Sequence, residues 1–275
     1  MRKILFASLV IGFVMLQVLI FYRGIYIPPP VKMYELENIT LVKPAAAEFA
    51  DVFEKKAGGV VVLDLSHENN FLPSELNALY SRIISRNCTI EYLREAEKLS
   101  AALENASAFV VIAPEKAFSS EETSLVEKFL NRNRTLLLIA DPGRTSEMNS
   151  LSLKFGIIFE DDYLYNLKEN DGNFQYIFLK NFKQSSVTEN LSKIAFYAAG
   201  SITSPKGGII LTDENTLSSK KEGKEFAAAV LLDDKRILAL SDFTVLTSPY
   251  NSVLDNPKFI SNIADYLTTF HWAGS

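Results

Sequence analysis

Short apolar runs alternate with segments of helical periodicity between Gly59 and Gly156, and this alternation restricts the fold more than any other feature. The run "GVVVLDL" is rich in β-branched residues and lacks polar alternation, so its strand is expected to be buried on both faces. Strands that alternate with helices at this spacing predict βαβ units and a parallel sheet with right-handed crossovers. The expected fold class is α/β, doubly wound and flavodoxin-like. Strands are expected at 59–65, 88–93, 108–114 and 135–143.

Helices are expected between these strands, and their ends carry recognisable signals. Ser119 can cap a helix whose Glu122, three residues further on, completes a capping box. Pro73 suits a first helical position, and Gly156 suits the position after a last turn. The expected helices are 73–85, 99–106, 119–133 and 146–156.

The C-terminal half follows a different pattern. Residues 157–205 are aromatic and polar together and are expected to form an irregular insertion. A β-hairpin is expected at 225–243, after which a closing helix at 255–267 should pack back on the sheet. Asn256 is the expected cap of that helix, with Pro257 in its first turn. Further strands are expected at 193–202 and 207–212.

The N-terminal segment predicts a membrane anchor. Residues 4–22 carry no charge, and as a helix they would span about 28 Å, the thickness of the hydrocarbon core of a bilayer. No small-x-small cleavage site follows, which favours an uncleaved signal anchor over a cleaved signal peptide. Arg2 and Lys3 precede the run, so the N-terminus is expected in the cytoplasm and the body outside it. The expected parts are a tip and anchor at 1–24, a Pro-rich spacer at 25–42, a domain at 43–270 and a tail at 271–275.

Composition restricts the partners. A hydrophobic content of 48% and a charged content of 22% fit a folded body. The net charge of −5 and the lack of a Lys/Arg stripe argue against nucleic acid. The expected partners are the membrane, through residues 4–22, and a protein in the membrane or envelope. An external domain can also be glycosylated, and N-x-S/T sequons occur at Asn38, Asn87, Asn105, Asn133 and Asn190.

Polar side chains follow four of the expected strands at the points where the strands end. Ligands of open parallel sheets bind beyond the carboxyl ends of the strands. If the four strands are parallel and adjacent, these side chains form one rim that binds a ligand or a partner. The rim residues are Asp64, Ser66, His67 and Asn69; Glu115, preceded by Pro114; Asp141 and Arg144; and Asp242, with Asn251, Asp255 and Asn256 beyond it.

Two other interpretations of the rim are open. Asp64, Asp141 and Asp242 could hold Mg²⁺ through oxygen ligands, and His67 could then serve as acid or base in a metal-assisted hydrolase. Aspartates at strand ends also cap turns, so the rim could be purely structural and His67 a hydrogen-bonding turn residue. A phosphohydrolase-type signal would need a second Asp two residues after Asp64, where Ser66 stands. No cofactor is expected, apart from Mg²⁺ in the hydrolase alternative.

The sequence offers no nucleophile elbow. It contains no G-x-S-x-G or G-x-C-x-G motif, and the single cysteine, Cys88, opens an expected strand instead of ending one. The stretch "EKKAGGV" precedes a strand, whereas a phosphate-binding loop follows one. These features favour a role without catalysis.

Four motifs occur in order along the chain: D-x-S-H-x-N, P-x-x-x-F-S-x-x-E, a strand ending in A-D, and S-D-F followed by D-N-P-x-F. Over most of residues 58–270 the chain resembles an archaeal family of membrane-anchored domains of unknown function. That family is similar in fold to class I glutamine amidotransferases. It is also related to the external domain of gliding-motility-type ABC transporter auxiliary proteins and to the amino-terminal domain of an intraflagellar transport protein.

The resemblance implies an amidotransferase-like fold without amidotransferase activity. True amidotransferases carry a cysteine on an elbow after a strand, whereas the corresponding strand here, "AFVVIAP", runs into Pro114 and Glu115. The implied role is binding, as an auxiliary or scaffold component of an envelope or transporter complex.

Overall fold

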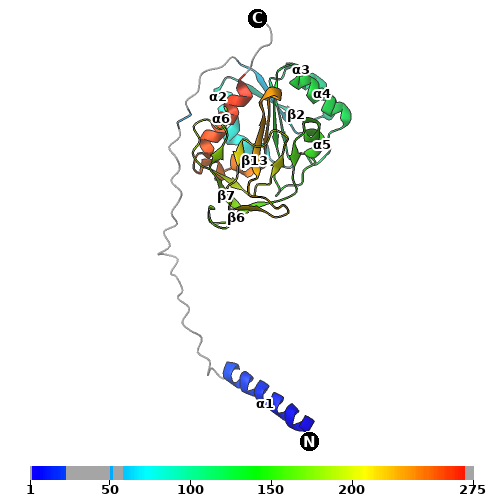
Figure 1. The fold of residues 1–275 in the computed structure, drawn as a ribbon. Coiled ribbons are helices and arrows are strands. Elements are labelled where there is room, and N and C mark those ends of the chain that lie inside the picture. Colours follow the sequence, from blue (N-terminus) through cyan, green and yellow to red (C-terminus); the bar gives the residue numbers. More distant parts are fainter. Residues whose placement is uncertain (1, 23–49, 52–57, 270–275) are drawn as a thin grey trace. The chain divides into compact units, whose positions relative to one another are not determined.

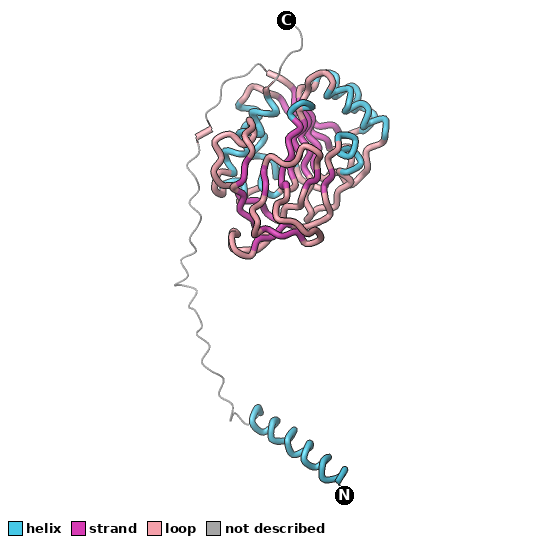
Figure 2. Tube along the Cα trace, viewed as in Figure 1, coloured by secondary structure: helices cyan, strands magenta, loops and turns pink. Residues whose placement is uncertain are grey.

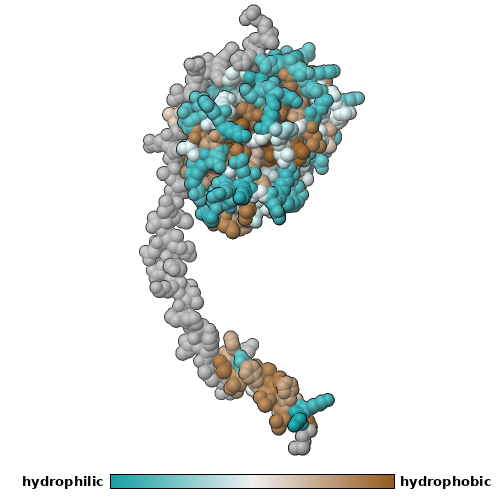
Figure 3. Space-filling view, in the orientation of Figure 1, coloured by the Kyte–Doolittle hydropathy of each residue, from teal (hydrophilic) through white to brown (hydrophobic). Residues whose placement is uncertain are grey.

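The computed structural model describes residues 2–22, 50–51 and 58–269, and the chain divides into two compact units, Met1–Lys43 and Pro44–Ser275 (Figure 1). In the first unit, α1 runs without a break from Arg2 to Tyr22, which confirms the expected helix. Among the described residues, α1 alone is long and apolar enough to cross a membrane, and its surface is hydrophobic along most of its length (Figure 3). The expected spacer at 25–42 and the expected tail at 271–275 lie outside the described residues.

An eight-stranded sheet forms the centre of the second unit. Five strands, which are neighbours at one side of the sheet, are mutually parallel, and helical crossovers connect four of them, as the alternation of strands and helices predicted. The expected hairpin is confirmed by the antiparallel pairing of its two strands, and two further strands extend the sheet in antiparallel fashion. In spatial order the strands are β2 (Thr89–Leu93), β1 (Val60–Asp64), β3 (Ala108–Ile112), β4 (Thr135–Ile139), β14 (Ile237–Leu240), β13 (Ala227–Leu232), β11 (Ile210–Leu211) and β8 (Asn181–Phe182).

Helices cover both faces of this sheet, with the strands between them (Figures 1 and 2). Successive side chains of a strand point to opposite faces, so Val61 and Leu63 enter one core and Val62 enters the other. The first face is covered by α2 (Asn77–Ser85) and α6 (Asn256–Thr268), and the second by α3 (Leu99–Asn105), α4 (Ser120–Leu130) and α5 (Asn149–Ser152). Short 3₁₀ turns lie at Pro73–Leu76, Ala96–Lys98, Leu153–Phe155, Asp233–Lys235, Thr244–Leu246 and Tyr250–Ser252.

Three of the four predicted helix ends are confirmed, and one of them is Pro73, the first residue of the 3₁₀ turn that leads into α2. Ser119 accepts a bond from the Glu122 amide at 3.2 Å, and the Glu122 carboxylate accepts one from the Ser119 amide at 2.8 Å. Gly156 adopts the left-handed conformation, with φ of 77°. The prediction for Asn256 is wrong, because Asp255 occupies the cap position and Asn256 is the first helical residue. The Asn256 carboxamide instead bonds both main-chain groups of Ala195, at 3.1 and 3.0 Å.

Residues 157–205, expected to form an irregular insertion, contain six short strands that are separated by loops. The expected strand at 193–202 is broken, at Ala198, whose φ is 61°. Such short strands pair over long sequence distances, so no local pattern announces them. The pairs are β5 (Ile158–Phe159) with β10 (Ile202–Thr203), β6 (Leu164–Asn166) with β12 (Thr216–Ser218), and β7 (Tyr176–Leu179) with β9 (Ile194–Tyr197).

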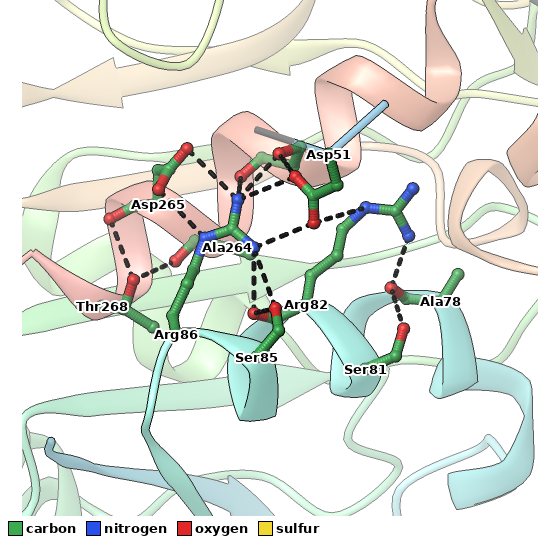
Figure 4. A network of polar contacts seen from close by, with 10 residues as sticks. Asp51, Ala78, Ser81, Arg82, Ser85, Arg86, Ala264, Asp265 and Thr268 are labelled. Atoms are coloured by element: carbon green, nitrogen blue, oxygen red, sulfur yellow. Dashed lines mark hydrogen bonds and ion pairs between the residues drawn. The ribbon is translucent and has the colours of Figure 1, made fainter. Parts of the chain in front are cut away.

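The edge at which the parallel strands begin, here called the amino edge, is closed by a buried arginine. Arg86 follows α2 and is fully buried, between Asp51 at the start of the unit and Asp265 near the end of α6 (Figure 4). Its guanidinium donates to Asp265 at 2.9 Å and to both carboxylate oxygens of Asp51, at 3.1 and 3.2 Å. The Ser261 hydroxyl accepts a further bond at 2.8 Å. These ion pairs therefore connect Asp51, the end of α2 and the end of α6 at the amino edge of the sheet.

Candidate functional site

The four strands predicted to end in polar loops are neighbours in the sheet. The strands β1, β3, β4 and β14 lie side by side and run in the same direction. The last residues of β3, β4 and β14 are in register, with Ile139 of β4 between Ile112 of β3 and Leu240 of β14. This edge is here called the carboxyl edge. The predicted geometry of one edge with four polar loops is thus confirmed, whereas binding at that edge stays a prediction.

The loops after β1 and β3 are bonded to each other. The Asn69 carboxamide donates to the Ile112 carbonyl at 2.8 Å, and the His67 carbonyl accepts from the amides of Glu115 and Lys116, both at 3.0 Å. The strand order reverses between β1 and β3, which is where open α/β sheets usually bind ligands. In this chain the protein's own hydrogen bonds fill that position.

The His67 side chain is held inside the protein on three sides. Its exposed fraction is 1%, and its ring stacks on Phe118 with centroids 3.7 Å apart. Nδ1 lies 2.9 Å from Oδ2 of Asp64. Nε2 lies 3.4 Å from Oε1 of Glu122, without the alignment of a hydrogen bond. Burial would raise the pKa of the Glu122 carboxyl, but bonds from Ser119 and the nearby imidazole outweigh that effect and lower it.

Ser66, Asp64 and His67 do not form a catalytic relay. The Ser66 hydroxyl donates to Oδ1 of Asp64 at 2.7 Å and lies 3.1 Å from His67 Nδ1. In a nucleophilic triad the carboxylate and the hydroxyl contact opposite nitrogens of the imidazole. Here both contact Nδ1, so the imidazole cannot take a proton from Ser66 while Asp64 orients it.

The end of β3 has an elbow-like backbone and an inert side chain. Ala113 follows β3 directly and has φ of 37°, which is strained for a residue with a Cβ atom. Strained turns after a strand are where α/β enzymes present a nucleophile. A methyl group cannot act as one, so the elbow here has a shape without a reactive atom.

Asp141 and Asp242 are both buried at the carboxyl edge and both cap turns. Asp242 accepts bonds from the amides of Tyr197 at 2.6 Å and Thr244 at 2.7 Å. Asp141 accepts from the amides of Gly143 at 2.8 Å and Phe243 at 3.2 Å. Burial raises the pKa of Asp242 well above its usual range, and the charge of Asp141 raises it further.

The structure does not assemble the three predicted metal ligands. Asp64 faces His67 and Ser66, while Asp141 and Asp242 face main-chain amides. Among residues 2–22, 50–51 and 58–269, no three His, Cys, Asp or Glu side chains lie together in a way that could hold a metal ion. The geometry therefore gives the Mg²⁺ alternative no support.

Arg144 links the loops after β1 and β4. Its guanidinium donates to the Asn70 carbonyl at 2.5 Å and to Glu75 at 2.7 Å, and lies 4.3 Å from the ring centroid of Phe243. Burial would raise the pKa of Glu75, but the bonds from Arg144 and from the Leu72 amide outweigh it and lower that pKa. Arg144 thereby sets the distance between two of the predicted rim loops.

Asn251, Asp255 and Asn256 are the last three residues predicted for the rim, and the side chain of each bonds to main-chain groups. Asn256 is fully buried. The Asp255 carboxylate accepts from the amides of Ser192 and Lys193, at 2.7 and 2.9 Å. The Asn251 carboxamide donates to the Leu246 carbonyl at 3.2 Å. Sequence order placed them near the rim, but Asp255 and Asn256 join the start of α6 to residues 192–195, and Asn251 bonds to the preceding turn.

A pocket of about 400 Å³ opens beside the loop after β4 and is here called the β4 pocket. Asp141 and Arg144, two of the predicted rim residues, line it, and residues from the insertion form its other wall. Gly200 belongs to that wall, where an added Cβ would come within 3.0 Å of Pro142. The residues not predicted from the sequence include Thr145, Ser146, Asn149, Glu160, Gly200, Ser201 and Ser241.

A shallower groove lies over the loop after β1 and is here called the β1 groove. Arg144 lines both the groove and the β4 pocket, whereas the buried Asp64, His67 and Asp242 line neither. The rim is thus two adjacent concave surfaces on a closed base of hydrogen bonds. The groove is lined by Glu68, Asn69, Asn70, Phe71, Leu72, Glu75, Glu115 and Arg144.

Comparison with known proteins places the fold within the α/β class. Neither a protein-family model nor a curated protein matches the sequence. The structure is similar to the mmIFT52 N-terminal domain at 15% identity and a TM-score of 0.61, covering 76% of this chain and 98% of that one. A ThuA-like protein from Bacteroides uniformis matches at 8% identity and a TM-score of 0.48, covering 76% of this chain and 90% of that one.

An exo-β-1,4-mannosidase, Op5Man5, from an Opitutaceae bacterium matches at 10% identity and a TM-score of 0.41, covering 77% of this chain and 36% of that one. At such low identity the likeness to the mmIFT52 domain concerns the fold alone, and the two weaker matches add nothing to it. The class defined by the structure is an α/β domain with a large, mostly parallel central sheet, in a chain with one apolar N-terminal helix.

Proposed function

We propose that this chain is a single-pass membrane protein whose extracytoplasmic domain binds a partner without catalysing a reaction. It would serve as an auxiliary or scaffold component of an envelope or ABC-transporter-type complex. The resemblance to archaeal membrane-anchored domains with an amidotransferase-like fold supports this assignment, as does the apolar helix α1 with Arg2 and Lys3 before its core.

One observation carries the proposal: the carboxyl edge keeps an open pocket while its chemical groups are closed off. His67 is buried between Asp64, Phe118 and Glu122, and Ala113 stands at the elbow. The β4 pocket remains open and is lined by polar side chains from two separate parts of the chain. Such a surface is suited to recognition and poorly suited to proton transfer or nucleophilic attack.

The test fills the pocket in the full-length chain in its own membranes. Thr145 is exposed and lines the β4 pocket, so Thr145→Trp would occupy it without disturbing the core. Ser124→Trp is the matched control, because Ser124 is exposed on α4 and lines none of the rim surfaces. We expect chemical crosslinking followed by mass spectrometry to recover the same partner from wild type and Ser124→Trp, with at least tenfold less from Thr145→Trp.

A second measurement addresses catalysis directly. The purified protein is presented with a broad panel of esters, amides, phosphoesters and glycosides, with and without Mg²⁺. We expect no turnover above background. Turnover that disappears in both His67→Ala and Asp64→Asn would overturn the proposal and restore the hydrolase alternative.

A further inference from the structure

Asn38, in the first N-x-S/T sequon, lies outside the described residues, and the structure separates the other four sequons into two groups. Asn87, Asn105, Asn133 and Asn190 are all exposed residues. The hydroxyl residues that complete the motifs differ, and the motif requires that hydroxyl as well as the asparagine. In the first group, the sequons of Asn87 and Asn190, the Ser or Thr is exposed. In the second group, the sequons of Asn105 and Asn133, it is buried.

The hydroxyls of the second group are buried in the sheet and hydrogen-bonded there. Ser107 is 3% exposed and donates to the Val60 carbonyl at 2.7 Å. Thr135 is 1% exposed and accepts from the Arg236 guanidinium at 2.9 Å. They stand at the starts of β3 and β4, whose residues are all buried. To free either hydroxyl, central strands of the sheet would have to open, which costs close to the global free energy of unfolding.

The first group is accessible in the folded domain. Thr89 is exposed at the start of β2, the edge strand, and within the described part of the chain its hydroxyl makes only a long contact of 3.4 Å to the Gly59 carbonyl. Ser192 is exposed in the loop before β9, where its hydroxyl donates to Asp255 at 2.7 Å. Edge strands and surface loops open at low cost. Both motifs can therefore enter a transferase site without disturbing the core.

Backbone conformation does not by itself explain these motifs. Asn87, Asn133 and Asn190 all have positive φ, at 63°, 59° and 54°, a conformation that asparagine tolerates better than most residues. This accounts for the asparagines but not for Thr89, whose hydroxyl has no hydrogen bond shorter than 3.4 Å to any described residue. Thr89 is thus the motif residue whose presence the packing leaves unexplained.

We infer that Asn87 and Asn190 carry N-linked glycans in the folded domain, and that Asn105 and Asn133 do not. The inference rests on the extracytoplasmic location in the proposed function. The donor would be a membrane-lipid-linked oligosaccharide activated by phosphate. The Asn Nδ2 attacks C1 of the sugar, the C1–O bond to the lipid phosphate breaks, the lipid phosphate leaves with the electron pair, and one amide proton passes to a base of the transferase.

The two sites leave the rim open. Neither Asn87 nor Asn190 lines the β4 pocket or the β1 groove. Asn190 does line a separate open cavity of about 730 Å³ beside β8, with Lys180 and Lys183. A glycan at Asn190 would cover that cavity and leave the two rim surfaces uncovered.

The test is site-specific glycopeptide mass spectrometry on the full-length protein from its own membranes. We expect sugar masses on peptides with Asn87 and Asn190 and unmodified peptides with Asn105 and Asn133. Thr89→Ala, which retains Asn87, should reduce occupancy there at least tenfold, whereas Thr89→Ser should retain it. Ser192→Thr should likewise retain occupancy at Asn190.

Bare Asn87 and Asn190 in the wild-type protein would overturn the inference, as would glycans on Asn105 or Asn133. Failure here and failure of the proposed function can be told apart. Bare asparagines together with partner capture that Thr145→Trp abolishes would reject the glycans and leave the binding function standing. Glycans at both sites, together with partner capture that Thr145→Trp leaves unchanged, would support the glycans and reject binding at the β4 pocket.

Discussion

The two edges of the central sheet bury charged groups in opposite ways. At the amino edge, the fully buried Arg86 lies between two carboxylates, Asp51 and Asp265, which remain 24% and 36% exposed. At the carboxyl edge, Asp242 is fully buried next to Asp141, and main-chain amides are its hydrogen-bond donors. At the amino edge, carboxylates balance the charge of Arg86. At the carboxyl edge, the dipoles of main-chain amides stabilise Asp242.

The pKa shifts follow this difference. Burial would raise the pKa of Asp51, but the bonds from Arg86 and Ser261 outweigh it and lower that pKa. For Asp242, burial and the charge of Asp141 raise the pKa, and the bonds from amides offset only part of the rise. The amino edge is therefore built for stability at neutral pH, whereas the carboxyl edge holds a carboxyl whose ionisation the fold opposes.

The largest expected effect comes from removing the compensating charge. Arg86→Met would remove the cation that lies between Asp51 and Asp265, while Arg82, whose Nε is 4.0 Å from Asp51, would remain. Breaking a buried ion pair costs several kcal/mol, and because both carboxylates keep contact with water we expect a loss of about 3 kcal/mol. The measurement is urea unfolding of the full chain in detergent at pH 7.

A matched control separates burial from charge. Lys98→Met removes a lysine that is 66% exposed and paired with Glu95, and should change the unfolding free energy by less than about 0.5 kcal/mol. If Arg86→Met behaves like Lys98→Met, the ion pairs do not secure the amino edge, and the contrast between the edges fails.

The next effect concerns the base of the rim. His67→Ala would leave a gap beside Phe118 and deprive the buried Asp64 of a hydrogen-bond donor, so we expect a loss of about 2 kcal/mol. Partner capture should persist, because the His67 side chain lines neither rim surface. Normal stability combined with lost capture would show that His67 contacts the partner directly.

The sequence predicted the parallel half of the fold because its signals are local. The run from Val60 to Asp64 and the capping box at Ser119 and Glu122 are legible within a few residues. The four strand ends on one edge followed from the parallel order of their strands. Whether a strand-end side chain faces solvent depends on packing around it, so the burial of His67 and Asp242 was not foreseeable.

The remainder depends on contacts between distant residues. Arg86 meets Asp265 across 179 positions, and nothing in "SRIISRN" distinguishes it from an exposed helix end. The wall of the β4 pocket requires that Gly200 approach Pro142, which joins two segments with no common local motif. The short ribbons of the insertion have the same non-local origin, since β6 pairs with β12.

The smallest expected effect tests the carboxyl edge through its pH dependence. A raised pKa means that folded Asp242 binds its proton more tightly than the unfolded chain does. Its contribution to stability is therefore complete below the ordinary carboxyl pKa of about 4 and is lost as pH rises toward the folded pKa. Asp141→Asn removes a charge that raises this pKa, so the decline in unfolding free energy between pH 5 and 7 should become shallower. The variant should also lose about 1 kcal/mol at every pH, because its amide would face the Phe243 N–H.

Asp51→Asn is the control for this measurement, because the pKa of Asp51 is shifted in the opposite direction. A lowered pKa contributes stability above the ordinary carboxyl range that is lost as pH falls toward the folded pKa. Asp51→Asn should therefore flatten the acid side of the profile, below about pH 4, and leave the slope between pH 5 and 7 unchanged. Urea unfolding of both variants from pH 3 to 8 would distinguish the edges. An unchanged slope in Asp141→Asn would mean that the charge of Asp141 does not raise the pKa of Asp242, and the carboxyl edge would then owe its pH dependence to burial alone.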